Sequence, residues 1–397
     1  MSDNIFTMLP TQRLGVTVST YVLPLGWLII LTGMFWAWDR NLYHRLFYLF
    51  LAAPTLLAIT FQPRIFRGLV VNPIFIAFIV FSGYTVLSII WSDTESSAGS
   101  LTKRPLYIAM LLLSAGIITL QSPSQLQRCV RLAAVLAAVT AVCSFSYFIL
   151  SKGDSGERLI GYGALYNPLL TGHVFGAFAS IWLASWFQAR TVLNPLSLIC
   201  LTALCAAILA TGSRTPLIGL TAALGWLLLV GDRRRGLLAI TVLGVVLISI
   251  ILLYPEAITQ RGVSYRPAIW MEALRQISES PWLGHGYDSP MTVIIPGMNQ
   301  TFADPHNIEL GVLYAGGIVG LALWMVLYGL AAYFCWSHRK HHGVTLAATW
   351  LVFGFASGLT EGSAFMSRPK EHWFLIWLPM ALVYAQSLIH WRRKPLP

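Results

Sequence analysis

Long runs of apolar residues recur along almost the whole chain, and they constrain the fold more than any other feature of the sequence. A helix that crosses a bilayer needs about 20 mostly apolar residues, and about twelve runs are close to that length. They lie at roughly 21–38, 42–60, 71–91, 105–120, 130–150, 168–188, 195–211, 215–230, 236–254, 308–334, 343–361 and 372–390. We therefore expect an all-α, polytopic integral membrane protein with about twelve transmembrane helices.

The composition excludes several classes of protein for the chain as a whole. Of its 397 residues, 56% are hydrophobic and 10% are charged, whereas a soluble domain has roughly 25% charged residues. A soluble globular enzyme, a nucleic-acid-binding domain and a disordered protein are therefore excluded. A membrane β-barrel would show short alternating segments instead of long apolar runs. No small-residue cleavage site follows the first run, so we interpret that run as a retained helix rather than a signal peptide.

The sequence predicts no metal ion and no cofactor. None of the five cysteines forms a C-x-x-C pair, and all lie in or beside apolar runs, which argues against a disulfide framework and a zinc site. No Asp-x-Asp pair lies on the predicted outer face, so a divalent-metal site for a nucleotide sugar is poorly supported. The cysteines are Cys129, Cys143, Cys200, Cys205 and Cys335.

Positive charge is distributed unevenly between the two sides of the predicted helices. With a cytoplasmic N-terminus, the cytoplasmic segments hold 14 Lys and Arg residues and two acidic residues, while the opposite side holds 12 basic and 13 acidic residues. An excess of Lys and Arg in short loops is typical of the cytoplasmic side. The net charge of +11 is thus a topology signal, and no nucleic acid is needed to explain it. Both termini are predicted to be cytoplasmic.

One connection is much longer than the others. Residues 255–307 separate the ninth and tenth predicted helices on the outer face, within a single transmembrane domain that spans 1–397. Long loops in compact proteins are usually functional or disordered, and the aromatic, Gly and Pro content of this one favours packing. Within it, Pro267–Ser280 is predicted to be an amphipathic helix. Its expected apolar face carries Ile269, Trp270, Ala273, Leu274 and Ile277.

Two arginines on the predicted outer face are the first candidates for chemistry. Arg214 lies in the turn 211–216 between two apolar runs, next to a helix N-terminus that favours anions. Arg266 opens the amphipathic helix, where a cation is unfavourable unless it has an anionic partner. The alternatives are an Arg214 side chain that reaches to the membrane interface and an Arg266 side chain that is solvated in a loop.

Histidines near the tenth run form the second group of candidates. His306, in Asp304-Pro305-His306-Asn307, is expected at a helix N-terminus, where the helix dipole lowers the pKa of a histidine and favours the neutral form. A neutral imidazole can act as a general base, and a capping or interface histidine is the alternative. His285 is a weaker candidate of the same kind.

Four further polar residues are open to two interpretations. His173, near a helix start, is either functional or a packed histidine. Glu361, Glu371 and His372 flank the last outer loop and are either partners for the arginines or part of an acceptor site.

The order and placement of these motifs resemble those of the O-antigen ligase family, in the O-antigen ligase/polymerase superfamily. His306-Asn307, nine further residues and the segment 317–320 look like that family's H-[N/S/Q]-x9-G-x-x-G signature. The stretch from Arg266 through Trp270 to 281–286 is similar to its R-x3-W…P-x-x-G-x-G pattern. Ser213-Arg214 resembles its S-R turn between two helices, so the motif-level resemblance runs over roughly residues 160–330.

This resemblance implies an enzyme: a GT-C-like, lipid-linked sugar transferase of the bacterial inner membrane with its active site on the periplasmic face. The donor would be a glycan on undecaprenyl diphosphate, and the acceptor a sugar hydroxyl of lipid A-core, with inversion and without a metal ion. Carried over residue by residue, Arg214 and Arg266 would bind the diphosphate, while His306 would activate the acceptor or stabilise the leaving group. Substrate-binding roles would extend to Asn307, His285 and Arg261.

Two alternatives to a ligase remain open from the sequence. An O-antigen or exopolysaccharide polymerase of the same superfamily would use the same chemistry on another lipid-linked acceptor. Protein O-glycosyltransferases share parts of the motif but tend to continue well beyond the last helix, which counts against them. A flippase or secondary transporter is disfavoured, because transporters often show internal repeats and polar residues near the membrane midplane. Here no repeat is visible, and the polar residues gather at one face.

Overall fold

The computed structural model describes residues 10–152, 157–253, 265–295 and 301–391, most of which lie in helices. The α-helices are α1 (Pro10–Thr17), α2 (Leu23–Thr32), α3 (Arg40–Phe47), α4 (Ala53–Phe61), α5 (Pro63–Val70), α6 (Pro73–Leu87), α7 (Ala98–Gln121), α8 (Gln125–Lys152), α9 (Pro168–Gln188), α10 (Pro195–Ala210), α11 (Thr215–Val230), α12 (Arg233–Leu253), α14 (Arg266–Ile277), α15 (Ile308–Ser337), α16 (His342–Gly358) and α17 (Trp377–Trp391). Short π or 3-10 turns are η2 (Val18–Val22), η3 (Gly33–Phe35), η4 (Tyr48–Ala52), η5 (Ser88–Trp91), η6 (Gly163–Leu165) and η7 (Glu371–Phe374). Two short strands, β1 (Val293–Ile294) and β2 (Thr301–Phe302), pair antiparallel.

Eight helical segments among the described residues are long and apolar enough to cross a membrane. They are Leu14–Phe35, Arg40–Phe61, Pro73–Trp91, Ala98–Gln121, Gln125–Ser151, Pro168–Gln188, Ile308–Ser337 and Glu371–His390. The helices α10 and α11 are apolar but shorter. Many large apolar side chains on the outer helices are exposed, as a surface in contact with lipid requires. The chain is therefore an all-α, multi-pass membrane protein, as predicted, while the count of twelve crossings stays a prediction.

Several boundaries differ from those expected. The run predicted at 105–120 is the C-terminal part of α7, which begins at Ala98 and contains Pro105. Charged residues near its start hide this part of the helix from a search for apolar runs, and proline is tolerated in membrane helices. The run predicted at 343–361 ends as a helix at Gly358. Glu361 therefore lies in the loop that follows α16, and this difference matters for the site.

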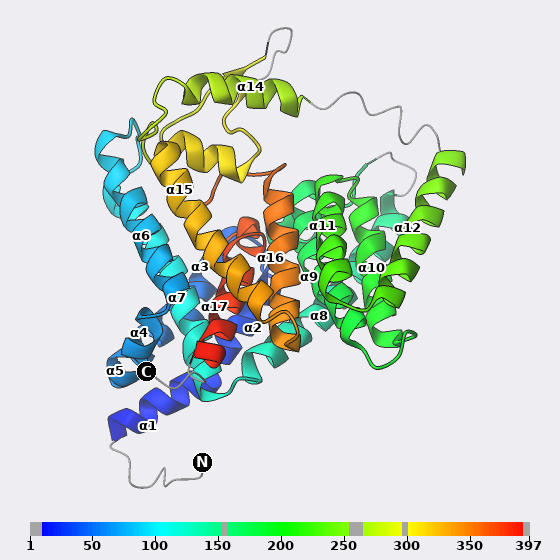
Figure 1. Cartoon of the computed structure of the whole chain (residues 1–397), viewed down its shortest axis with the longest axis horizontal. Coiled ribbons are helices and arrows are strands. Elements are labelled where there is room, and N and C mark those ends of the chain that lie inside the picture. The colour runs from blue at the N-terminus through cyan, green and yellow to red at the C-terminus, as the bar shows by residue number, and fades with distance from the viewer. Residues whose placement is uncertain (1–9, 153–156, 254–264, 296–300, 392–397) are drawn as a thin grey trace.

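Helices α9 and α17 are buried over most of their length, whereas α8 is largely exposed. Large aromatic side chains fill the centre, and the fully buried tryptophans are Trp27, Trp324, Trp350, Trp373 and Trp377. In Figure 1, α1 and the C-terminal end of α17 lie at one end of the molecule, and α14 lies at the opposite end. This arrangement agrees with termini on one side and the long connection on the other. Which side is periplasmic, and the treatment of 1–397 as one domain, stay predictions.

The connection between α12 and α15 carries the predicted amphipathic helix, as α14. Its residues Ile269, Ala273 and Ile277 are buried in a small separate core with β1 and α15. The expected apolar face was too wide, because Leu274 is 48% exposed. Trp270 is partly buried and packs against the same core, so Leu274 is the one residue of the expected apolar face that lies outside it. The two short strands were not predicted.

Candidate active site

Arg266 forms an ion pair with Glu361 at the end of the helix bundle that carries α14. Its Nη2 atom lies 3.2 Å from Oε2 of Glu361, and the carboxylate is only 8% exposed. Arg266 is the first residue of α14, where the helix dipole disfavours a cation. The anionic partner that this position calls for is thus supplied from the loop after α16. This confirms one of the two interpretations that the sequence left open for Glu361.

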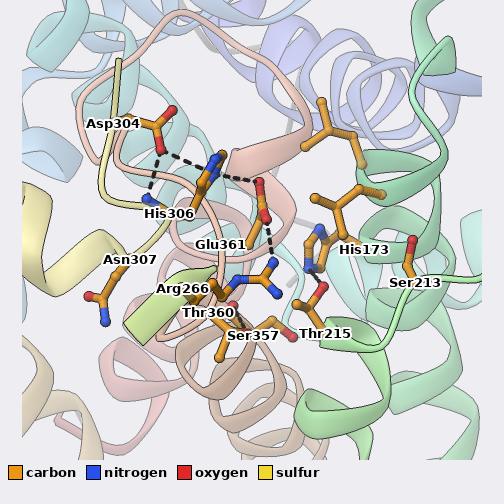
Figure 2. A network of polar contacts seen from close by, with 12 residues as sticks. His173, Ser213, Thr215, Arg266, Asp304, His306, Asn307, Ser357, Thr360 and Glu361 are labelled. Carbon is orange, nitrogen blue, oxygen red and sulfur yellow. Dashed lines mark hydrogen bonds and ion pairs between the residues drawn. The ribbon is translucent and has the colours of Figure 1, made fainter. Parts of the chain in front are cut away.

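His306 contacts the same carboxylate from the other side. Its Nδ1 atom lies 3.6 Å from Oε1 of Glu361 and 3.2 Å from Oδ1 of Asp304. Figure 2 shows Glu361 between Arg266 and His306, with Asp304 on the far side of the imidazole. Two of the three predicted catalytic residues therefore converge on one buried carboxylate. We call Arg266, Asp304, His306 and Glu361 the carboxylate network.

The backbone at His306 adopts a left-handed conformation, with φ of 48°. The backbone N–H of His306 donates to Oδ1 of Asp304 at 2.8 Å, which closes a tight Asx turn. Histidine is among the residues that tolerate this region, but such conformations cluster at functional sites. The turn aims the imidazole back at Glu361 instead of along α15.

The structure reverses the expected direction of the His306 pKa. The carboxylate of Glu361 raises the pKa of His306, against the lowering effect of burial, and Asp304 adds to the rise. The prediction that the helix dipole lowers the pKa of His306 was wrong for a geometric reason. Asn307, not His306, caps α15, so the imidazole faces two carboxylates in place of the positive helix end.

Two further side chains hold the His306 turn in place. Trp270 donates from Nε1 to the carbonyl oxygen of Pro305 at 3.1 Å, one helical turn after Arg266 on α14. Asn307 accepts from the backbone N–H of Leu310 at 2.9 Å, and its Nδ2 donates to the carbonyl oxygen of Leu359 at 2.9 Å. Asn307 thus ties the start of α15 to the loop that carries Glu361. Its proposed contact with substrate stays a prediction, and its observed contacts are those of a positioning residue.

The glycine motifs pack against each other. Gly317 has φ 60° and ψ −165°, a conformation essentially restricted to glycine, and it kinks α15. A Cβ on Gly284 would lie 2.5 Å from the backbone nitrogen of Gly317, and a Cβ on Gly317 would overlap the carbonyl oxygen of Trp282. Backbone hydrogen bonds stabilise this contact. In one of them, the N–H of Ile318 donates to the carbonyl oxygen of Pro281 at 2.8 Å. The two motifs therefore fix the long connection onto α15, close to the His306 turn.

Arg214, between α10 and α11, makes no ion pair within the described residues. It precedes α11 and is exposed. Its neighbour Thr215 is 2.9 Å from Nε2 of His173, which is fully buried on α9. Figure 2 places Thr215 and His173 next to Arg266 and Glu361. His173 thus packs between the turn and the network, while the role of Arg214 stays a prediction.

The remaining predicted residues lie elsewhere. His285 is 2.9 Å from the carbonyl oxygen of Gln276, and its ring stacks on Tyr314 with centroids 4.4 Å apart. These contacts fasten α14 to α15, and no contact with the carboxylate network is found among the described residues. Glu371 forms an ion pair with Arg40 at 2.6 Å, so it is not the partner of Arg214 or Arg266. Arg261 lies outside the described residues.

The sequence interpretation missed two contributors. Asp304 was noted only as part of a motif, although an aspartate side chain often accepts from the backbone N–H two residues on, in an Asx turn. Arg158 donates from Nη2 to Oγ of Ser213 at 3.0 Å and from Nε to the carbonyl oxygen of Thr211 at 2.7 Å. It braces the turn before Arg214, and nothing in its local sequence marks it. Among the described residues, no cluster of His, Cys, Asp and Glu could hold a metal ion.

Comparison of the sequence with known proteins points to one family. A family model described as O-antigen ligase matches residues 196–325. That segment includes Arg214, Arg266 and His306, but it ends before Glu361. A protein of Pseudomonas aeruginosa named O-antigen ligase is 57% identical over 368 residues, which cover 93% of this chain and 91% of that protein.

Proposed function

Because the chain belongs to the O-antigen ligase family, we propose that it transfers a glycan from undecaprenyl diphosphate to a sugar hydroxyl of lipid A-core. Transfer proceeds without a metal ion, inverts the anomeric carbon, and takes place at the periplasmic face of the inner membrane. The 57% identical relative named O-antigen ligase supports a ligase over a polymerase of the same superfamily. The observation that carries the proposal is the carboxylate network, in which Glu361 joins Arg266 to His306.

The arginines stabilise the departing diphosphate. Negative charge develops on the bridging oxygen as its bond to the anomeric carbon breaks, and fixed cations at that point lower the barrier. The planar Arg266 guanidinium suits phosphate geometry, and Glu361 holds it through Nη2. Arg214, exposed in the turn before α11, adds a second guanidinium in this proposal. Together they supply the positive charge that a metal ion supplies in other transferases.

His306 accepts the proton of the acceptor hydroxyl. The two carboxylates face Nδ1, so they favour a proton there and leave the lone pair of Nε2 for the substrate. A raised pKa makes the imidazole a stronger base, and Glu361 and Asp304 stabilise the imidazolium that forms. The acceptor oxygen bonds to the anomeric carbon, the bond to the diphosphate oxygen breaks with its electron pair, and the proton moves to Nε2. Attack from the face opposite the leaving group inverts the configuration.

Deletion of the gene with plasmid rescue tests the proposal. If the chain is a ligase, the deletion strain loses long-chain lipopolysaccharide on gels and accumulates polymerised lipid-linked glycan. Wild type restores the ladder, and His306→Ala does not. Lipopolysaccharide with a single repeat unit would instead identify a polymerase, and an unchanged ladder would refute a role in either step.

A further inference from the structure

A second feature of the outer end of the molecule is a cavity of about 540 Å³ beside the His306 turn. Its size is typical of sites for small organic ligands, roughly 300–1,000 Å³. Asp304 and Pro305 form part of its wall, so the cavity is directly adjacent to the carboxylate network. Its other walls come from α3, α7, α15, the segment 287–291 and the loop 363–370.

The cavity is lined by cations from three distant parts of the chain. They are Arg40, Arg104, Arg368 and Lys370. All four lie outside the segment 196–325 that matches the family model. None of them takes part in the carboxylate network, and the transfer chemistry proposed above does not use them.

Two of these cations are neutralised by carboxylates, and two are not. Arg40 pairs with Glu371 at 2.6 Å, and Arg104 pairs with Asp288 at 2.7 Å. Within the described residues, neither Arg368 nor Lys370 forms an ion pair. The cavity therefore offers two cations that form no ion pair in the part of the chain that the structure describes, although the carboxylate of Asp304 also lines it.

Lys370 is the more informative of the two. It is partly buried in the loop before η7, on the cavity wall. Burial lowers its pKa, and Arg40 and Arg104 act in the same direction, although Glu371 and Asp304 oppose them. Holding a partly buried ammonium group without an ion pair is costly. An anion bound between these cations would remove that cost.

We propose that this cavity is a subsite for an anionic sugar, one that carries a phosphate or carboxylate group bound by Arg368 and Lys370. The inference rests on the proposed function, because it places a saccharide next to His306. An arginine fork binds such oxyanions through two parallel bonds, and a lysine adds a compact charge. The anion belongs either to the acceptor oligosaccharide or to the glycan being transferred.

Binding measurements on the purified full-length protein separate these sources. The probes are the oligosaccharide released from lipid A-core and the glycan released from the donor, each native and after removal of phosphate and reduction of carboxyl groups. Wild type is compared with the Arg368→Gln, Lys370→Gln double variant. We expect the double variant to bind one native probe at least about ten-fold more weakly, the effect of losing one charged hydrogen bond. It should bind the neutralised form of that probe as wild type does.

Two further variants and a transfer assay make the outcome specific. Lys370→Arg should recover most of the binding, and Lys103→Gln, a neighbour of Arg104 that does not line the cavity, should leave it unchanged. In transfer, the double variant should raise KM for the same substrate with little change in kcat. Equal binding of all native probes by wild type and the double variant overturns the inference. Anion-dependent binding by a wild type that transfers nothing upholds the subsite and refutes the proposed function.

Discussion

Replacing Glu361 with glutamine removes one negative charge from the centre of the carboxylate network while keeping the size of the side chain. Oε2 of Glu361 holds Arg266 at 3.2 Å, and Oε1 lies 3.6 Å from His306. The substitution therefore weakens both the positioning of a cation for the diphosphate and the stabilisation of the imidazolium. We expect the protein to fold and its rate of transfer to fall.

The geometry sets the size of the effect. The Arg266 side chain is 28% exposed, so its pair with Glu361 is worth about 1 kcal/mol after solvent screening. The contact with His306 exceeds hydrogen-bond length, so we assign about 1–2 kcal/mol to its charge interaction, toward the low end of the range for a full charged hydrogen bond. Together these losses predict a fall in kcat of roughly 30- to 160-fold. Loss of the base itself, in His306→Ala, predicts roughly 10²- to 10⁴-fold.

The pH dependence gives a second readout with a defined sign. The neutral form of His306 is the base, and Glu361 raises the His306 pKa above its ordinary value of 6.5. Transfer by wild type therefore falls as the pH decreases through that raised pKa. Glu361→Gln removes the raising charge, so this acidic limb moves to lower pH while the plateau falls.

Initial rates of transfer by purified protein between pH 5 and 9 measure both effects. Glu371→Gln is the matched control, because it removes an equally buried carboxylate from Arg40 without a contact to His306. Its acidic limb should stay at the wild-type position. A Glu361→Gln variant with the wild-type plateau and an unmoved limb would refute the assigned role of Glu361.

Three further predictions concern the supports of the site. Gly317→Ala forces a side chain into a conformation restricted to glycine and against the carbonyl oxygen of Trp282, so thermal unfolding should show a loss of about 2 kcal/mol or more. Asn307→Ala removes the cap of α15 and should cost about 1 kcal/mol by the same measurement, together with a reduced rate of transfer. Trp270→Phe removes the bond to Pro305 and should cost about 1 kcal/mol; unchanged stability and transfer would show that this bond does not hold the turn.

Much of the fold follows from the sequence, because the thickness of a bilayer dictates the length of an apolar run. Each run expected from the sequence coincides with at least part of a helix. The errors arise where charge or packing interrupts that rule, as at the start of α7, where Lys103 and Arg104 precede the apolar part of the helix. The short strands were missed because two-residue pairings leave no periodic pattern.

The site was predicted in part for a related reason. Arg266 and His306 lie in local motifs, and their placement at element ends is visible in the sequence. The partner that joins them, Glu361, lies 55 residues after His306, and no local pattern shows that the two meet. The predicted lowering of the His306 pKa was wrong for the same reason. It considered only the dipole of the nearby helix and not the carboxylate of Glu361, which tertiary structure brings to His306.

The cavity could not be predicted from the sequence either, because its cations come together only through tertiary structure. Arg40, Arg104 and Lys370 lie in three separate parts of the sequence and meet only in the folded molecule. None of them forms a motif with its sequence neighbours.

The most direct test of the central claim is transfer by the purified protein from undecaprenyl-diphosphate-linked glycan to lipid A-core, with product detected on gels. We predict that wild type forms the product, and that His306→Ala and Arg266→Ala, folded to the same extent by thermal unfolding, lose at least about 100-fold of its rate. Transfer by both variants at the wild-type rate would contradict the assignment of the carboxylate network as the active site.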